Sequence, residues 1–486
     1  MRLSELLREV EFEGSIKNDF DIKFVTDDSR LVRPGALFVC IRHRSFDGHT
    51  AAAEALASGA AAVVTQERLG LENELNVADS RAAYARLCAA LCGHPERKLR
   101  MIGVTGTNGK TTVTTLIRNI LSDSGIKTLL TGTVCNRLGE ESLPSGLTTP
   151  KPPELYSLLS RAVLSGCDAC VAEASSQALA QGRLEGIAFD AAVFTNITRD
   201  HLDYHGTFEN YLAAKKKLFE HSEVSAVNLD DPRADEIIAA SSGKTVTFST
   251  VLDCADYTAK NISLLPEGVS FELVSKGRIE HINFASPGLF SVSNAMAAVV
   301  CAINLGVDPR SAAQSLARSK GVCGRLERVE CGTPYSVIID YAHTPDGLEQ
   351  VLRALRPSCR GKLIVLFGCG GDRDKTKRPL MGAAACKYAD TVIVTSDNPR
   401  SEEPMKIIGD ILKGTDKKRR GLFIEEDRRR ATALALSLAK PGDTVLLAGK
   451  GHEKYQLICG EKLPLDERET VREILGLPHD TGRKKP

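Results

Sequence analysis

The feature that most constrains this chain is a glycine-rich segment, GTNGKTT, at residues 106–112. An apolar stretch that begins at Met101 precedes it, and an amphipathic stretch that ends at Gly125 follows it. This order predicts a buried strand, a tight loop and a helix, an arrangement that binds phosphate groups. Glycines let backbone N–H groups approach phosphate oxygens, Lys110 adds a positive charge, and the Thr111 hydroxyl can bind Mg²⁺.

The segment departs from the usual phosphate-loop pattern at one position. The first glycine of that pattern would fall at Val104, and Gly106 supplies it instead, which we interpret as a subfamily variant. The alternative is a strand-to-helix turn without a ligand, but such a turn does not require a lysine and hydroxyls in register. We therefore expect ATP to bind at Gly106, Thr107, Asn108, Gly109, Lys110, Thr111 and Thr112.

Length and charge exclude several classes of protein. With 486 residues the chain is expected to form two to four domains. The 63 Lys and Arg balance the 62 Asp and Glu, so the basic excess typical of nucleic-acid binding is missing. The start of the chain lacks a signal-peptide pattern, and the longest apolar run is about half of a membrane span. We expect a cytoplasmic monomer that neither enters a membrane nor binds nucleic acid.

The chain contains 14 cysteines, scattered through apolar segments. Cys167 and Cys170 have CxxC spacing, but no second CxxC accompanies them. Packing of reduced thiols in the core is the favoured interpretation, and metal or redox use is the alternative.

Strand and helix patterns alternate along the chain in three blocks. The first hundred residues read as a small α/β unit, and the polar segment Gly93–Arg100 follows it. From Met101 the alternation predicts a mainly parallel sheet with helices on both faces, and from Ser336 it restarts as a doubly wound unit. We expect an α/β protein with domains at residues 1–99, 100–328 and 329–486.

Charged residues follow the strands of the central block. Glu173 ends one strand, where a carboxylate in the same sheet as a phosphate loop is placed to hold Mg²⁺. The next strand ends in a loop that carries His201, a candidate metal ligand or phosphate contact. A solvated loop is the alternative for His201, and a solvated helix face is the alternative for Lys215–Lys217.

Three polar loops, GGDRDKTKR, DNPR and GKGHE, follow three strands of the last block. They carry Arg373, Arg400, Asp397, Asn398 and Glu453, and they are expected to meet at one edge of the sheet. Arginines bind carboxylates and acidic residues bind ammonium groups, so the set fits an amino acid with more than one carboxylate. Three ordinary solvated loops are the alternative.

Together, TGTNGKTT, FTNITRDHLDYHG, DYAHTPDGL, GDRDKTKRPLM, SDNPR and AGKGHE make the whole chain resemble the Mur ligases of peptidoglycan synthesis. The resemblance implies a small N-terminal UDP-substrate domain, a central P-loop ATPase and a C-terminal Rossmann-like domain. It also implies a reaction in which ATP phosphorylates a carboxylate and an amine then attacks the acyl phosphate.

The resemblance assigns roles to further residues. A magnesium site is implied at Thr111, Glu173, His201 and Lys215, with Lys215 carbamylated because Tyr211–Lys215 matches the family's YxxAK pattern. Contacts to ATP are implied for Asn294, Arg325 and Asp340. The UDP substrate is expected at Ser29, Arg44, Ser45, Phe46, Thr148, Thr149, Ser175, Gln181 and Arg183.

The resemblance also implies which amino acid is added, through the arginine of the DNPR motif. In the family it accompanies meso-2,6-diaminopimelate, added to UDP-N-acetylmuramoyl-L-alanyl-D-glutamate. The expected contacts are Arg373, Asp397, Asn398, Pro399, Arg400, Gly449 and Glu453. The alternatives are ligation of L-lysine or another diamino acid, a ligase like folylpolyglutamate synthetase, a non-catalytic ATP-binding scaffold, and a P-loop motor.

Overall fold

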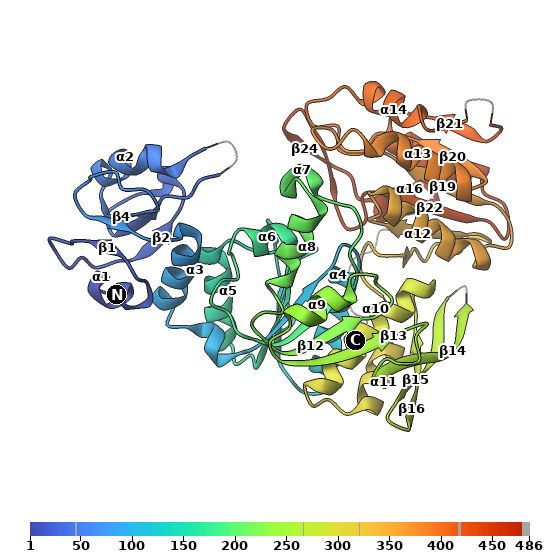
Figure 1. The fold of residues 1–486 in the computed structure, drawn as a ribbon. Helices are drawn as coiled ribbons and strands as arrows, with labels where there is room; N and C mark the ends of the chain where they lie inside the picture. Colours follow the sequence, from blue (N-terminus) through green and yellow to red (C-terminus); the bar gives the residue numbers. More distant parts are fainter. Residues whose placement is uncertain (44–45, 266, 320, 417–418, 479–486) are drawn as a thin grey trace.

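The computed structural model describes residues 1–43, 46–265, 267–319, 321–416 and 419–478. These residues form three α/β units, each built around its own sheet, which follow one another along the chain (Figure 1). The expected α/β fold class is therefore confirmed. No described helix is long and apolar enough to cross a membrane.

The N-terminal unit contains a five-stranded sheet in the order β1-β5-β4-β3-β2. Strands β2 to β5 are parallel, and β1 pairs antiparallel with β5. The apolar side of α3 packs against α5 of the central unit, so the cores of the two units are continuous. The elements are β1 (Glu13–Gly14), β2 (Phe24–Thr26), β3 (Ala36–Val39), β4 (Ala60–Thr65), β5 (Glu74–Asn76), α1 (Leu3–Leu6), α2 (Ala52–Ala57) and α3 (Ser80–Leu91).

The central unit contains an eleven-stranded sheet in the order β16-β15-β14-β13-β12-β11-β6-β10-β7-β8-β9. Its middle is parallel, and antiparallel strands extend both edges. Helices α4, α10 and α11 cover one face, while α5, α6 and α8 cover the other.

The strands of the central unit are β6 (Arg100–Thr105), β7 (Thr128–Thr131), β8 (Asn136–Leu138), β9 (Glu141–Leu143), β10 (Ala169–Glu173), β11 (Phe189–Phe194), β12 (Ser222–Asn228), β13 (Lys244–Ser249), β14 (Tyr257–Leu265), β15 (Gly268–Ser275) and β16 (Arg278–Phe284). The helices are α4 (Lys110–Asp123), α5 (Pro152–Leu164), α6 (Ser176–Ala180), α7 (Leu202–His205), α8 (Phe208–Lys216), α9 (Ala234–Ala240), α10 (Leu289–Asn304) and α11 (Pro309–Arg318).

The C-terminal unit contains a six-stranded sheet in the order β17-β18-β22-β19-β20-β21. All neighbours are parallel except β17 and β18. Helices α12, α13 and α14 pack on one face, and α15 and α16 pack on the other.

The strands of the C-terminal unit are β17 (Glu327–Arg328), β18 (Ser336–Asp340), β19 (Leu363–Phe367), β20 (Thr391–Val394), β21 (Leu422–Ile424) and β22 (Thr444–Ala448), with a separate hairpin of β23 (Tyr455–Ile458) and β24 (Glu461–Pro464). The helices are α12 (Pro345–Leu355), α13 (Lys377–Tyr388), α14 (Pro404–Leu412), α15 (Arg428–Leu438) and α16 (Glu467–Ile474).

The predicted strands and helices of the alternating blocks are present, but one helix is shorter than expected. The pattern predicts a helix from Glu209 to His221, whereas α8 ends at Lys216 and a turn follows. Cys167 and Cys170 are buried free thiols, as core packing predicts.

Candidate functional site

A cleft of about 920 Å³ lies between the central and C-terminal units. Its walls come from the loops that follow parallel strands in both sheets, because such loops meet at the carboxyl edge of a sheet. β6 lies between β10 and β11, so the glycine loop is next to the ends of those two strands.

The loop after β6 is held against the end of β11 by side chains. The N–H of Asn108 donates to Asn196 Oδ1 at 2.9 Å, and Thr195 Oγ1 donates to the Asn108 carbonyl at 2.6 Å. A Cβ at Gly106 would lie 1.9 Å from Thr195 Oγ1, and one at Gly109 would lie 2.5 Å from Asn294 Oδ1. Glycine is therefore required at both positions, and the loop's backbone stays open to the cleft.

Lys110 begins α4 and folds back on the loop. Its Nζ donates to the carbonyls of Gly106 at 2.8 Å and Thr107 at 2.9 Å. Desolvation lowers the pKa of Lys110, while the Glu173 and Asp200 carboxylates oppose that shift. The ammonium group thus lies where a bound phosphate would replace the two carbonyls as its partner.

Glu173 ends β10 with a buried carboxylate that accepts three hydrogen bonds. Thr111 Oγ1 donates to Oε2 at 3.1 Å, and Thr133 donates to both oxygens, from its N–H at 2.8 Å and its Oγ1 at 2.9 Å. The predicted neighbours Thr111 and Glu173 are therefore in direct contact.

Lys215 is fully buried on α8, and its Nζ lies 4.6 Å from the centre of the Tyr211 ring. Desolvation lowers the pKa of Lys215 well below its usual range, and the positive charge of Lys110 lowers it further. A lysine with this environment readily loses its proton. The structure separates it from Lys216 and Lys217, whose side chains are more exposed.

His201 precedes α7 in the left-handed backbone region, with φ 51°. Its Nε2 lies 3.5 Å from Asp200 Oδ2, and its ring meets the edge of Tyr211 at a centroid distance of 6.2 Å. Both His201 and Lys215 line the cleft. Among the described residues, no three His, Cys, Asp or Glu side chains lie close enough together to hold a metal ion.

The residues predicted to contact ATP beyond the loop also line the cleft. Arg325 lies over the Tyr341 ring at 4.6 Å and donates to Thr111 Oγ1 at 3.3 Å. Asp340 ends β18, and its two oxygens accept from the N–H groups of Leu326 and Ala342, both at 2.7 Å. Burial raises the pKa of Asp340. Asp340 therefore shapes the connection between the two units.

Four of the residues predicted to contact the UDP substrate form one hydrogen-bonded network. Thr149 Oγ1 lies 3.0 Å from Ser175 Oγ, and Arg183 donates to the Thr149 carbonyl at 2.7 Å. Arg183 also donates to Gln181 Oε1 at 2.7 Å. Thr148 is next to them in the chain, and its hydroxyl lies 3.0 Å from that of Thr133.

Other predicted residues do not line the cleft. Ser29 begins a 3₁₀ turn (Ser29–Leu31) of the N-terminal unit, and Phe46 is exposed there. Gln181 is hydrogen-bonded to Arg183, which does line the cleft. The Pro399 carbonyl lies close to Gly371. Arg44 and Ser45 lie outside the described residues.

In the C-terminal unit β22, β19 and β20 are adjacent, so the loops GKGHE, GGDRDKTKR and DNPR meet at one end of the cleft. Arg373 and Arg400 both line this end, and a Cβ at Gly370 would lie 2.8 Å from Arg400 NH1 and 3.8 Å from the Cγ of Arg373. Arg400 NH1 donates to the Gly371 carbonyl at 2.7 Å, and the Arg400 backbone pairs with the hairpin β23–β24. This end of the cleft is suited to carboxylate groups.

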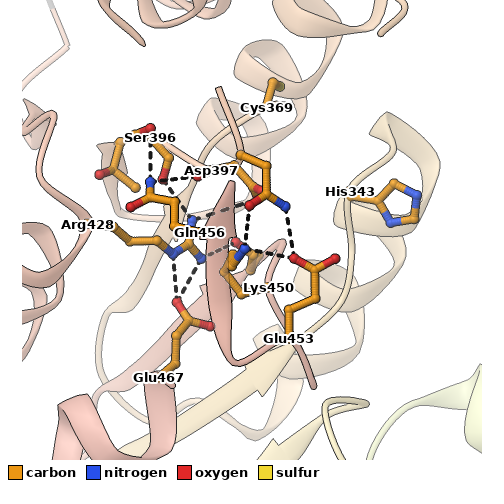
Figure 2. Close-up of polar contacts among 12 residues, drawn as sticks. His343, Cys369, Ser396, Asp397, Arg428, Lys450, Glu453, Gln456 and Glu467 are labelled. Atoms are coloured by element: carbon orange, nitrogen blue, oxygen red, sulfur yellow. Dashed lines mark hydrogen bonds and ion pairs between the residues drawn. The ribbon is translucent and has the colours of Figure 1, made fainter. Parts of the chain in front are cut away.

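Asn398 and Glu453 line the same cleft and are bound to each other, with Nδ2 of Asn398 2.9 Å from Glu453 Oε2. Figure 2 shows Lys450 beside the Glu453 side chain, to which its Nζ donates at 2.7 Å. Asp397 is mostly buried, and Arg428 NH1 lies 3.9 Å from its Oδ2.

Three buried charged residues support these loops and were not expected from the sequence. Arg428 donates to Glu467 Oε1 at 2.8 Å and to the carbonyls of Ala448 and Ser396 at 2.8 and 3.3 Å (Figure 2). It thereby ties the ends of β20 and β22 to α16. Lys450, the third, is part of GKGHE, so its position directly after a glycine at a strand end was a usable signal.

Comparisons with known proteins identify the family. Residues 21–89, 104–302 and 324–451 match the models of the Mur ligase family catalytic domain, the Mur ligase middle domain and the Mur ligase glutamate ligase domain. A curated protein of Syntrophomonas wolfei subsp. wolfei, named UDP-N-acetylmuramoyl-L-alanyl-D-glutamate–2,6-diaminopimelate ligase, is 43% identical over 98% of this chain and 99% of its own length. The chain belongs to the Mur ligase family.

Other comparisons agree on this family. A Clostridium tetani protein with the same name is 41% identical over 98% of this chain and 99% of its own length. A solved structure of a protein named UDP-N-acetylmuramoyl-L-alanyl-D-glutamate–2,6-diaminopimelate ligase has 34% identity, covers 98% of this chain and 99% of its own, and gives a TM-score of 0.72. As a Mur ligase, the chain is an ATP-dependent ligase.

Proposed function

We propose that this Mur ligase adds meso-2,6-diaminopimelate to the D-glutamate of UDP-N-acetylmuramoyl-L-alanyl-D-glutamate. The observation that carries the proposal is that one cleft is lined by the phosphate loop and also by Arg373, Arg400 and Glu453 of the C-terminal loops. The names of the full-length relatives support the same substrates. We further propose that the reaction takes place in the cytoplasm. The three domains are proposed to comprise residues 1–99, 100–328 and 329–486.

The chemistry joins a carboxylate to an amine. A carboxylate is a poor electrophile, so transfer of the γ-phosphoryl group of ATP to the D-glutamate carboxylate creates an acyl phosphate and releases ADP. The amine of diaminopimelate then attacks the acyl carbon, the phosphate leaves, and an amide forms with loss of a proton. Lys110 and the N-terminus of α4 offset the negative charge that moves between phosphate oxygens.

Mg²⁺ would stabilise the charge of the phosphate groups. As it stands, the region offers the Thr111 hydroxyl, the Glu173 carboxylate and the His201 ring, together with the cationic Lys110. Magnesium prefers anionic oxygen ligands, so the set fits the ion only when Lys215 contributes one. We infer that the neutral Nζ of Lys215 adds to CO₂ and loses a proton, which converts a buried amine into a carbamate anion.

The remaining predicted contacts are assigned by their positions. Thr148, Thr149, Ser175 and Arg183 lie beside Glu173 and are proposed to bind the sugar and peptide part of the UDP substrate, with Gln181 holding Arg183. The uridine end is proposed to contact Ser29 and Phe46 of the N-terminal unit. Arg44 and Ser45 lie outside the described residues and are proposed there from the family resemblance alone. Asn294, Arg325 and Asp340 are proposed to contact ATP, and Gly449 and Pro399 to shape the amino-acid site.

A phosphate-release assay tests the reaction. We expect phosphate only when the UDP-dipeptide and diaminopimelate are both present, in an amino-acid panel that includes L-lysine. Release with a folate acceptor, or with L-lysine but not diaminopimelate, would instead support one of the other ligases, and release with no amine would support a P-loop motor. ATP binding without release would support a scaffold.

Replacing Arg400 by Ala tests the arginine site. Loss of a charged partner in a buried site costs about 3–5 kcal/mol, so we expect the KM for diaminopimelate to rise at least about tenfold and the KM for ATP by less than about twofold. Arg429→Ala is the matched control, because Arg429 is an exposed arginine that pairs with Glu473 away from the cleft. Equal increases in both KM values would contradict the assignment.

A further inference from the structure

Lys450 is a fully buried lysine at the end of β22, directly after Gly449. A buried ammonium group is costly unless it is paired and hydrogen-bonded. Its environment therefore indicates what it does, and it lies within reach of the proposed amino-acid site (Figure 2).

The contacts of Lys450 form a closed triangle. Its Nζ donates to Asn398 Oδ1 at 2.8 Å and to Glu453 Oε2 at 2.7 Å, and Asn398 Nδ2 donates to the same Oε2 at 2.9 Å. The N–H of Leu457 donates to Asn398 Oδ1 at 2.9 Å. Lys450 therefore fixes the amide of Asn398 in one orientation and occupies one oxygen of Glu453.

The triangle leaves two groups available for a ligand. Within the described part of the chain, no hydrogen-bond donor reaches Glu453 Oε1, and Asn398 Nδ2 has a second hydrogen beyond the one given to Glu453. An oxygen that accepts beside an N–H that donates matches an ammonium group beside a carboxylate. That pair of groups is the far end of a diamino dicarboxylic acid.

The charges of the neighbouring side chains also favour a ligand with a carboxylate at its far end. Lys450 compensates the negative charge of Glu453, and the cationic side chains of Arg373 and Arg400 line the same cleft. Without Lys450 the uncompensated carboxylate would repel the far carboxylate of the ligand and would favour a simple amine such as the side chain of lysine.

We propose that Lys450 is a positioning residue that makes Asn398 and Glu453 select an amino acid with both an ammonium group and a carboxylate at its far end. This inference rests on the proposed function, because it assumes that these side chains contact the incoming amino acid.

The test measures phosphate release by the full chain with the UDP-dipeptide, ATP and either diaminopimelate or L-lysine. For Lys450→Met we expect the KM for diaminopimelate to rise at least about tenfold, with the KM for ATP within about twofold. The ratio of kcat/KM for diaminopimelate to that for lysine should fall by at least about tenfold. Lys462→Met is the matched control, since Lys462 is an exposed lysine that contacts the same Tyr455 ring, and its replacement should leave all these values unchanged.

A second pair of variants covers the case in which Lys450→Met does not fold. The Glu453→Gln variant and the Lys450→Met/Glu453→Gln variant differ only at Lys450, and the double variant buries no unpaired carboxylate. Because the N–H of Leu457 still donates to Asn398 Oδ1 in both variants, the main effect of Lys450 is expected through Glu453, and the two KM values for diaminopimelate should agree within about threefold. A tenfold difference between them would overturn the inference.

The outcomes separate this inference from the proposed function. A wild-type chain that releases no phosphate with diaminopimelate overturns both. A wild-type chain that does use diaminopimelate, combined with a Lys450→Met variant of unchanged discrimination, overturns the role of Lys450 alone.

Discussion

At the scale of single residues, Gly449 shows how closely the amino-acid site is packed. Its φ of 110° disfavours other residues, and a Cβ there would lie 2.4 Å from Asp397 Oδ2. We expect Gly449→Ala to lower the free energy of unfolding by more than the about 1–3 kcal/mol of backbone strain alone, and to raise the KM for diaminopimelate. Gly460→Ala is the control, because Gly460 has φ 86° and open space around it. If urea unfolding gave the same loss of unfolding free energy for Gly449→Ala and Gly460→Ala, the contact with Asp397 would be unimportant.

The charged residues of the site show what a sequence reveals at this scale. Lys110 and Glu173 stand in motifs at strand ends of one sheet, and parallel topology brings such ends together, so their proximity could be predicted. Arg400 belongs to another sheet, and its place in the same cleft depends on the orientation of the two units, which could not be predicted. Arg428 begins a run of three arginines that reads as a solvated helix face, yet it is fully buried while its two neighbours are exposed. Only tertiary contacts decide which member of such a run is buried.

At the scale of elements, the short helix α7 ends in a buried histidine whose Nε2 lies 3.0 Å from Ser176 Oγ of α6. Desolvation, aided by the charges of His201 and Lys215, lowers the pKa of His205 from 6.5 to about 4. Between these values the unfolded chain binds a proton that the folded chain does not, so stability is lost as the pH falls from about 6.5 towards about 4.

His205→Gln should therefore lose less stability over this pH range than the wild type. Urea unfolding at several pH values between about 7 and about 4 measures the difference. His281→Gln, at an exposed position on β16, is the control and should keep the wild-type dependence. If the free energy of unfolding of His205→Gln fell with decreasing pH as steeply as that of the wild type, His205 would not be the source of the pH dependence.

The elements that alternate between strand and helix could be predicted, because each combines an apolar strand with a glycine turn and an amphipathic helix. The antiparallel strands β14, β15 and β16 could not. They add to the edge of a parallel sheet, alternate between buried and exposed side chains, and lack the glycine-loop-helix signal. The hairpin β23–β24 is half-exposed and depends on pairing with Arg400, which no local pattern encodes.

At the scale of the whole molecule, Asp346 links two units across the cleft. It lies in the first turn of α12, and its Oδ2 accepts from Asn108 Nδ2 at 3.1 Å and from Thr198 Oγ1 at 3.2 Å. The C-terminal unit is thereby bonded to the phosphate loop itself. Because interfaces between domains are usually mobile, this carboxylate helps to set their relative orientation.

Asp346→Ala should raise the radius of gyration in small-angle scattering without nucleotide and increase the KM for ATP severalfold, because the Asn108 side chain loses its partner. Asp235→Ala is matched to it, since Asp235 is also an acidic residue in the first turn of a helix, but an exposed one on α9. Scattering curves that coincide for the two variants and the wild type would rule out this role.

The order of the units along the chain has a consequence for biosynthesis. Domains tend to fold one after another as the chain leaves the ribosome. The phosphate loop and Glu173 emerge early, whereas Lys450, Glu453 and the hairpin that pairs with Arg400 are among the last segments translated. A nascent chain can thus form its nucleotide site long before its amine site. Premature termination beyond the central sheet would yield a chain that keeps the phosphate loop and Glu173 but lacks the whole amine site.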